Sequence, residues 1–123
     1  MQIIPNKNAL HAKKPEGLEV SYFLFPEYEV HLDTQAPNTS QLWHHHEKVE
    51  ETVVIVDGEL LVKWRENGQT NSEIVRAGDL IRSERTPHNF ANVSDQIVKF
   101  IVIKQLLSGV DKSETLKNDK ILD

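Results

Sequence analysis

Apolar and polar residues alternate in short runs along most of this chain, and residues that favour turns separate the runs. Alternation puts every second side chain on the same face of a β-strand, which is the pattern of a strand with one buried face. We expect strands over residues 18–25, 28–32, 42–47, 52–56, 59–65, 72–76, 80–83, 88–92 and 96–106. Helical segments of about 10–15 residues, which a βαβ fold requires, are missing from the pattern, so it predicts an all-β sandwich or barrel.

Pairs of turn residues mark the connections between these runs. Asp57-Gly58 and Asn67-Gly68 each suit a two-residue hairpin turn, because both residues of the pair tolerate positive φ. We therefore expect residues 59–65 to pair back on 52–56. Beyond residue 110 the sequence becomes charged, and Asp111 with Glu114 could form a capping box. We expect one domain over residues 1–110, followed by a polar C-terminal tail or short helix over 111–123.

Length and composition exclude several classes of protein. The 123 residues correspond to a single domain, and the absence of cysteine excludes disulfides and thiolate chemistry. The first residues do not resemble a signal peptide, and no apolar run approaches the roughly 18 residues of a membrane helix, so we expect a cytoplasmic protein. The net charge of −5 and the lack of a basic cluster argue against a nucleic-acid surface.

The segment with the clearest chemistry is WHHHEKVEETVVIVDG, over residues 43–58. On a strand, His44 and His46 point to the same face, and Glu51 follows after four intervening residues. Two imidazoles on one face can converge on a single metal ion, and His88 on a later strand can lie opposite them. Three imidazoles and one carboxylate suit Mn, Fe, Co, Ni, Cu or Zn, and they leave coordination positions open.

Two segments resemble the signatures of the cupin superfamily. HHHEKVEETVVIVDG is similar to the first signature, in which His-x-His is followed by four residues, Glu, six residues and Gly, without a gap. GDLIRSERTPHNFAN resembles the second signature, in which a Pro-containing loop leads to His, three residues and Asn. Here Glu84 and Thr86 stand where the family usually has Pro and Gly, and the loop is one residue shorter. The resemblance implies a small antiparallel jelly-roll (cupin-like) β-barrel.

The resemblance also implies a site for one divalent transition metal ion. The residues that match the ligands of the family are His44, His46, Glu51 and His88. Asn92 matches the final Asn of the second signature, which is usually structural, and Gly58 serves the turn after the first signature.

Other interpretations of the same segments stay open. The His-His-His run could be a solvated polar patch, and His45 should face away from its two neighbours on a strand. Glu50 competes with Glu51 for the carboxylate role, because a β-bulge shifts the register by one residue. If the segment were a helix, His46 and Glu50 would share a face, but the β-branched run that follows disfavours it.

Further residues have simpler interpretations. His11 and His31 have no partners in the sequence and are expected at the surface. The aromatic residues expected in the core or a pocket wall are Trp43, Trp64 and Phe90. Arg82 and Arg85 could hold an anionic substrate, although exposed or ion-paired arginines are commoner. The run 96–104 carries apolar residues on both faces, which predicts an interface and hence a homodimer.

Two classes of function fit this pattern. The first is a metal-dependent enzyme that acts on a small organic molecule, with oxygenase chemistry favoured by analogy and isomerase, lyase and decarboxylase chemistry also open. The second is a non-catalytic module that binds a metabolite or a structural ion. A sensor domain of a regulator is disfavoured because no helix-turn-helix segment accompanies the predicted barrel.

Overall fold

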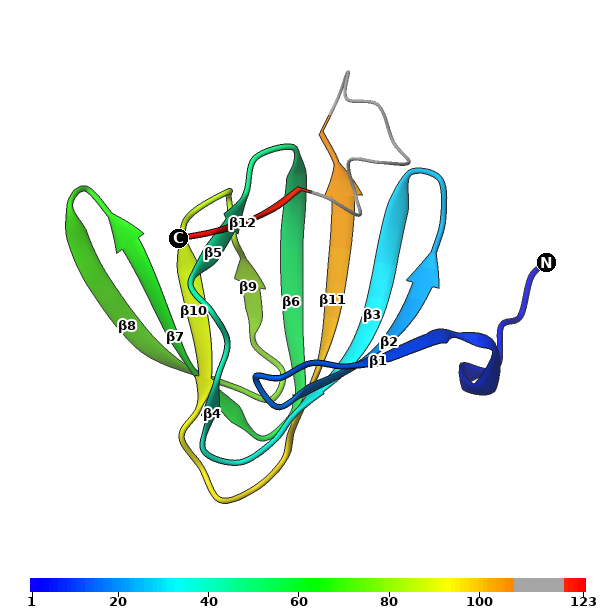
Figure 1. Cartoon of the computed structure of the whole chain (residues 1–123), viewed down its shortest axis with the longest axis horizontal. Helices are drawn as coiled ribbons and strands as arrows, with labels where there is room; N and C mark the ends of the chain where they lie inside the picture. Colours follow the sequence, from blue (N-terminus) through cyan, green and yellow to red (C-terminus); the bar gives the residue numbers. More distant parts are fainter. Residues whose placement is uncertain (108–118) are drawn as a thin grey trace.

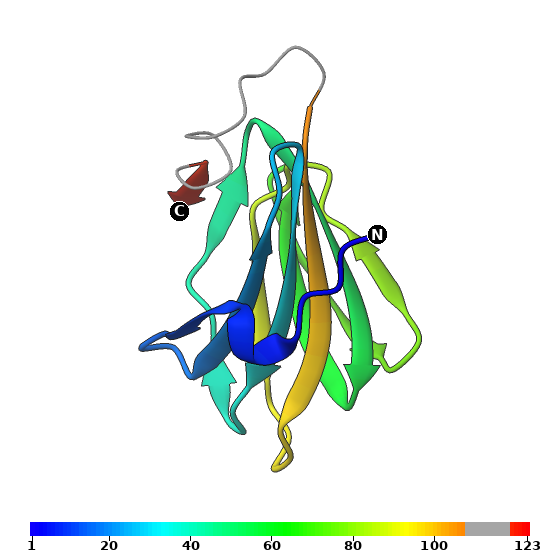
Figure 2. The ribbon, with the colours of Figure 1, turned by 90° about the vertical axis from the view of Figure 1, so that its right-hand side faces the viewer.

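The protein folds as two antiparallel β-sheets that face each other in a jelly-roll arrangement (Figure 1). This computed structural model describes residues 1–107 and 119–123. A 3₁₀ helix, η1 (Asn6–Asn8), precedes the first strand and lies outside the edge of the first sheet (Figures 1 and 2). Across the described ranges, no helix is long and apolar enough to cross a membrane. The all-β prediction is confirmed.

Six strands form the first sheet, in the order β1-β2-β3-β11-β6-β9. Their bounds are β1 (Leu10–Lys13), β2 (Leu18–Leu24), β3 (Tyr28–Gln35), β6 (Val49–Asp57), β9 (Leu80–Arg82) and β11 (Val98–Leu106). The second sheet has the order β12-β5-β10-β7-β8, with β4 paired to β10. Its bounds are β4 (Thr39–Ser40), β5 (His44–His46), β7 (Glu59–Glu66), β8 (Gln69–Arg76), β10 (His88–Asn92) and β12 (Lys120–Leu122).

One of the two predicted hairpins is wrong. Asn67 (φ 52°) and Gly68 (φ 73°) turn β7 back onto β8, as expected. The strands on either side of Asp57-Gly58 do not pair, because β6 belongs to the first sheet and β7 to the second. Gly58 has φ 89°, and a Cβ there would lie 3.1 Å from Val98 Cγ2. A turn that changes sheets needs glycine just as a hairpin does, so the pair of residues alone does not distinguish the two.

The hydrophobic core fills the space between the sheets at the end where they converge. Its fully buried members are Val53, Ile55, Leu60, Phe90, Val98 and Phe100, with further aliphatic residues around them. Asn92 is buried and donates from Nδ2 to the carbonyl oxygens of Gln35 (3.0 Å) and Gln96 (2.7 Å). These bonds tie the end of β10 to β3 and to the loop before β11, which fits the structural role expected for Asn92.

Strand β3 buries its polar face and exposes its apolar face. The inward residues are Glu29, His31, Asp33 and Gln35, and all four are buried. Leu32, between them, points outward and is 40% exposed. A strand normally buries its apolar side, but β3 does the opposite. The prediction that His31 lies at the surface is therefore wrong. Polar side chains on the inner face of a sheet instead line a site in the interior.

The C-terminal segment returns to the second sheet. Residues 120–122 form β12, which pairs with β5 and places Lys120 opposite His46. The capping box expected at Asp111 and Glu114 lies outside the described residues. Asp119 accepts hydrogen bonds on Oδ2 from the backbone N–H groups of Lys48 (2.8 Å) and Val49 (3.0 Å). The end of the chain is therefore anchored at the turn between β5 and β6.

The outer face of the first sheet carries exposed apolar residues, as expected from the two-faced run 96–104. Val98, Phe100 and Val102 are buried in the core, whereas Ile97 and Ile103 are 55% and 36% exposed. A groove of about 640 Å³ lies on this outer face, between β1, β2, β3 and β11. The homodimer stays a prediction.

Candidate metal centre

Three histidines meet at one place in the second sheet. His44 and His46 are the first and last residues of β5, and both side chains turn inward and are buried. His88 begins β10 and lies directly opposite His44 in the antiparallel register. The ring centroids of His44 and His88 are 4.5 Å apart, and those of His44 and His46 are 5.5 Å apart. The spacing of two residues on β5 and the pairing of β5 with β10 thus bring the rings together.

Glu51 supplies a carboxylate from the facing sheet. It lies on the inner face of β6 and is buried, with Oε2 3.0 Å from His46 Nε2 and Oε1 3.4 Å from His88 Nε2. Ligand atoms of His44, His46 and Glu51 all lie within 4.8 Å of one another. The cluster therefore joins two sheets through four side chains, and it has the donor set of a transition-metal site.

The orientation of two rings leaves their Nε2 atoms facing the centre of the cluster. His44 Nδ1 donates to the Leu42 carbonyl oxygen at 2.7 Å, and His88 Nδ1 donates to the Thr86 carbonyl oxygen at 2.8 Å. A ring that donates from Nδ1 carries its lone pair on Nε2, which is the arrangement that metal-binding histidines adopt. His88 Nε2 and both ring nitrogens of His46 are buried and make no hydrogen bond in the described part of the chain. Because buried polar atoms are rarely left without a partner, these nitrogens fit a bound cation.

The protonation states match this arrangement. Burial, and next the nearby His88, lower the pKa of His44 to about 3, against the opposing hydrogen bond to Leu42. Burial alone would raise the pKa of Glu51, but the adjacent rings of His46 and His88 and the charge of Lys104 hold it well below its ordinary value. A neutral imidazole and an ionised carboxylate are the forms that bind a metal ion.

The neighbouring residues lie outside the cluster, as expected. His45 points away from His44 and His46, and its Nδ1 lies 2.7 Å from Asp123 Oδ2, which raises the pKa of His45. Glu50 also points outward, where it pairs with Arg82 and accepts a hydrogen bond from the Glu84 backbone N–H at 3.0 Å. Arg82 is thus ion-paired.

The loop before His88 holds its shape despite the departures from the family pattern. Glu84 and Arg85 have φ values of 49° and 61°, a conformation that favours glycine. Ser83 anchors the start of the loop through its backbone N–H, which donates to the Glu51 carbonyl oxygen at 2.9 Å. Phe90 stacks on the His88 ring with centroids 4.7 Å apart and planes inclined by 21°. This aromatic wall fixes the plane of the His88 ring and confirms the inward position expected of Phe90.

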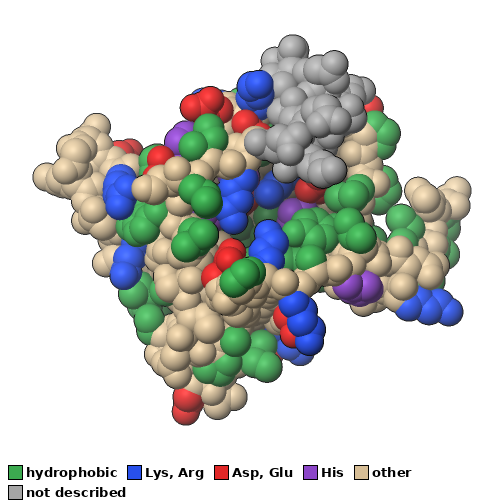
Figure 3. Space-filling view, in the orientation of Figure 1, with side chains coloured by type: hydrophobic (Ala, Val, Ile, Leu, Met, Phe, Trp, Pro, Cys, Tyr) green, Lys and Arg blue, Asp and Glu red, His purple; other side chains and the backbone are tan. Residues whose placement is uncertain are grey.

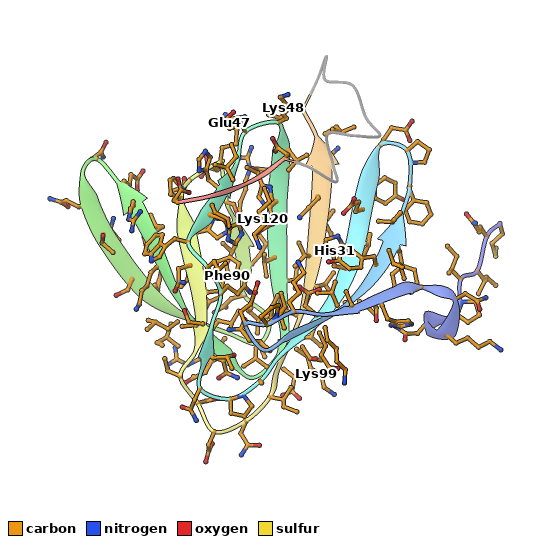
Figure 4. The ribbon with its side chains drawn as sticks, viewed as in Figure 1. His31, Glu47, Lys48, Phe90, Lys99 and Lys120 are labelled. Carbon is orange, nitrogen blue, oxygen red and sulfur yellow. The ribbon has the colours of Figure 1, made fainter. Side chains whose placement is uncertain are left out.

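A small cavity of about 40 Å³ adjoins the cluster. Its lining includes His44, His46 and Glu51, the inward residues His31 and Asp33 of β3, and three lysines, Lys14, Lys104 and Lys120. Figure 4 shows His31, Phe90 and Lys120 directed toward the space between the sheets, while Lys99 lies outside it. Sequence reasoning missed these cavity residues, because they come from four segments that are far apart in the chain.

A second cavity, of about 280 Å³, lies on the other side of His88 and Phe90. Its lining mixes polar residues with apolar side chains from β7, β8 and β9, among them Trp64, Val75 and Ile81. Trp64 is thus a wall residue, as expected. Trp43 is half-buried and lies under the guanidinium of Arg65, 4.0 Å from the ring centroid. The cluster therefore stands between one small cavity and one larger cavity.

Comparison with known families identifies this architecture. Residues 31–104, more than half of the chain, match the family model described as "Cupin domain". The chain belongs to the cupin family. The matched residues of this cupin include all four side chains of the cluster. No curated protein matches the sequence significantly.

Solved structures share the fold of this cupin at low sequence identity. A predicted oxalate decarboxylase from Thermotoga maritima has a TM-score of 0.72 and 18% identity over 86% of this chain and 100% of its own. A sugar phosphate isomerase of the cupin superfamily from Silicibacter pomeroyi has a TM-score of 0.65 and 18% identity over 80% of this chain and 70% of its own. A recombinant oxalate oxidase in complex with glycolate has a TM-score of 0.67 and 19% identity over 85% of this chain. This cupin spans 59% of the oxalate oxidase chain.

Proposed function

We propose that this cupin is a metal-dependent enzyme that acts on a small organic molecule. His44, His46, Glu51 and His88 are the proposed ligands of one divalent transition metal ion. The proposal depends on two buried atoms, His46 Nε2 and His88 Nε2, which have no hydrogen-bond partner. Both face the buried carboxylate of Glu51. A divalent ion bound there would act as a Lewis acid that polarises a substrate oxygen.

The residues around the cluster support a catalytic role over a purely structural one. A structural zinc site is usually saturated by four protein ligands and closed to solvent. Here a cavity of about 40 Å³ adjoins the cluster, and its lining combines core residues such as Phe90 with the polar side chains of His31 and Asp33 and with three lysines. Space beside the ligands allows a small molecule to reach the ion.

Two titratable side chains of the cavity, Asp33 and His31, can hold a proton beside a bound substrate. Burial, and next the charge of Glu51, raise the pKa of Asp33 to about 7, and its Oδ1 is buried without a partner. His31 Nε2 lies 2.6 Å from Glu29 Oε2, and burial lowers the pKa of His31 in spite of this bond. Asp33 exchanges its proton near neutral pH, which is the requirement for a general acid or base.

Among reactions, we favour oxygenase chemistry as the first to test. The three similar structures described above carry names of an oxidase, a decarboxylase and an isomerase, so the fold alone supports several reactions. Histidine nitrogens with one carboxylate suit iron and manganese as well as zinc. The identity of the retained metal therefore narrows the class of reaction: iron or manganese supports oxygenase chemistry, and inert zinc supports a structural site.

Elemental analysis of the protein purified without added metal tests the proposal. We expect about one equivalent of a transition metal in the natural protein and its loss in His46→Ala and His88→Ala, because each variant removes a proposed ligand. His45→Ala is the matched control, since its ring points away from the cluster, and it should retain the metal. Equal metal content in all four proteins, or none in the natural protein after metal is supplied, would overturn the proposal.

A further inference from the structure

Three lysines stand around the cavity beside the metal cluster, although they come from distant parts of the chain. Lys14 lies in the turn between β1 and β2, Lys104 lies on β11, and Lys120 lies on β12. All three are half-buried and line the same cavity of about 40 Å³. Figure 3, drawn in the orientation of Figure 1, shows Lys and His side chains close together near the centre of the visible face. The chain as a whole carries a net charge of −5, which makes this local group of cations distinct.

Strand register places two of these lysines directly beside the cluster. Lys104 pairs across the first sheet with Glu51 on one side and with Glu29 on the other. Lys120 pairs across the second sheet with His46. Residues opposite each other in an antiparallel pair point to the same face, so both ammonium groups face the cavity from opposite sheets. The two lysines and the cluster therefore border one space.

These lysines form few ion pairs with the described residues, although Glu51 and Glu29 lie beside Lys104. Lys120 has one weak partner, Glu16, at 4.0 Å. No carboxylate of the described residues lies within ion-pair distance of Lys14 or Lys104, and Lys14 instead lies 5.9 Å from the centroid of the Tyr22 ring. Burial, and then the charges of Lys14 and Lys104, lower the pKa of Lys120, against the opposing charges of Glu16 and Glu51. Gathering three cations costs free energy unless an anion binds among them.

The other two cavities lack a group of three lysines. In the 280 Å³ cavity the only cationic side chain among the described lining residues is Arg82, which is paired with Glu50. The outer groove is lined by two lysines, of which Lys13 pairs with Glu19 at 3.4 Å and Lys99 is exposed. The surplus of positive charge is therefore found at the cavity that reaches His44, His46 and Glu51.

We infer that this cavity binds the carboxylate of a small organic acid, held by Lys104 and Lys120 with Lys14 at the rim. The inference rests on the proposed function, because the carboxylate is positioned next to the proposed metal ligands. A volume of about 40 Å³ holds roughly three water-sized groups, which matches a carboxylate and is small for a phosphate. Asp33 Oδ1, buried in the cavity wall without a partner, supplies a polar contact when its carboxyl is protonated. The rest of the acid lies toward the cavity opening.

The binding test uses acetate as the probe, with acetamide as the neutral molecule of the same shape and inorganic phosphate as a larger anion. Calorimetric titration of the metal-loaded protein should show acetate binding, no acetamide binding and weaker phosphate binding. Lys104→Met and Lys120→Met should each weaken acetate binding at least about tenfold, because each removes a charged hydrogen bond. Lys99→Met is the matched control, since Lys99 is exposed on the outer face, and it should bind as the natural protein does.

Two further measurements distinguish loss of the carboxylate site from misfolding of a variant and from loss of the metal. Lys104→Arg and Lys120→Arg keep the charge and should retain acetate binding within about threefold, which excludes misfolding as the cause. Metal content, measured on every variant, should equal that of the natural protein. Unchanged acetate affinity in both Met variants with normal metal content would overturn the inference and leave the proposed function standing. If the natural protein retains no metal, the proposed function fails, and the same titration of metal-free protein then decides the lysine site. Tighter binding of phosphate than of acetate would overturn the assignment to a carboxylate.

Discussion

His46 Nε2 and Glu51 Oε2 lie 3.0 Å apart, although the two residues belong to different sheets. The turn between β5 and β6 carries the chain from one sheet to the other within five residues. The short connection explains why the spacing of His46 and Glu51 in the sequence is informative. A longer connection would not force the imidazole and the carboxylate to face each other across the interior.

Replacing Glu51 and Glu50 in turn by glutamine tests which of the two carboxylates binds the metal. Glu51→Gln should reduce metal affinity at least about 100-fold, because it removes the charged ligand from a buried site. Glu50→Gln should leave metal affinity unchanged, since Glu50 points outward to Arg82. Competition with a chelator of known affinity measures both. A greater loss in Glu50→Gln than in Glu51→Gln would show that the register is shifted by one residue.

Asp33 should make the stability of the metal-free protein depend on pH. Its pKa is raised from 3.8 to about 7 in the folded state, so the stability it contributes is present below pH 3.8 and is lost as pH rises through about 7. Above this pH the folded protein must bury an ionised Asp33, which costs free energy. Asp33→Asn removes that cost and should stabilise the metal-free protein by about 2–4 kcal/mol at pH 8 and by less at pH 5. Urea denaturation at both pH values measures the difference. An equal effect at the two values would contradict the raised pKa.

Phe90 should stabilise both the core and the metal site. Its side chain is 2% exposed and stacks on His88, so Phe90→Ala should reduce the free energy of unfolding by about 3–5 kcal/mol. Removal of the aromatic wall should also weaken metal affinity, because the plane of the His88 ring is no longer fixed. Phe100→Ala is a suitable control, since Phe100 belongs to the same core but lies on β11, in the facing sheet. Equal metal affinity in the two variants would mean that the stacking does not orient His88.

Much of this fold follows from the sequence, because most strands alternate and end at turn residues. Residues 88–92 were predicted as a strand, and β10 has those bounds. His31 is expected at the surface because it has no partner in the sequence, but on β3 Leu32 is exposed while His31 and Asp33 are buried. Alternation identifies two faces but not which one is inside when polar residues line an internal cavity.

The parts that sequence could not predict depend on long-range pairing. Nothing in the local sequence of Lys120 indicates that it lies opposite His46, because β12 is three residues long and pairs with a strand more than 70 residues earlier. Asp57-Gly58 gave no sign that β6 and β7 belong to different sheets. The His-x-His spacing succeeded because it depends only on strand geometry, which is local.

The outer face of the first sheet predicts a homodimer. Leu32, Val56 and Ile103 are 40%, 53% and 36% exposed on this side of the sheet, and such a surface is commonly covered by a second copy. Size-exclusion chromatography with light scattering should give twice the chain mass of 14.1 kDa. Leu32→Asp should shift the protein to the monomer, because it places a charge in the interface. A strict monomer of the natural protein at all concentrations would remove the prediction.

The central claim is that three imidazoles and one carboxylate hold a common cation, and anomalous diffraction from a crystal of the metal-loaded protein tests it most directly. The account predicts one anomalous peak at about 2.0–2.3 Å from the Nε2 atoms of His44, His46 and His88 and from a carboxylate oxygen of Glu51. A peak bound elsewhere, or a His88 ring turned away from the peak, would contradict it.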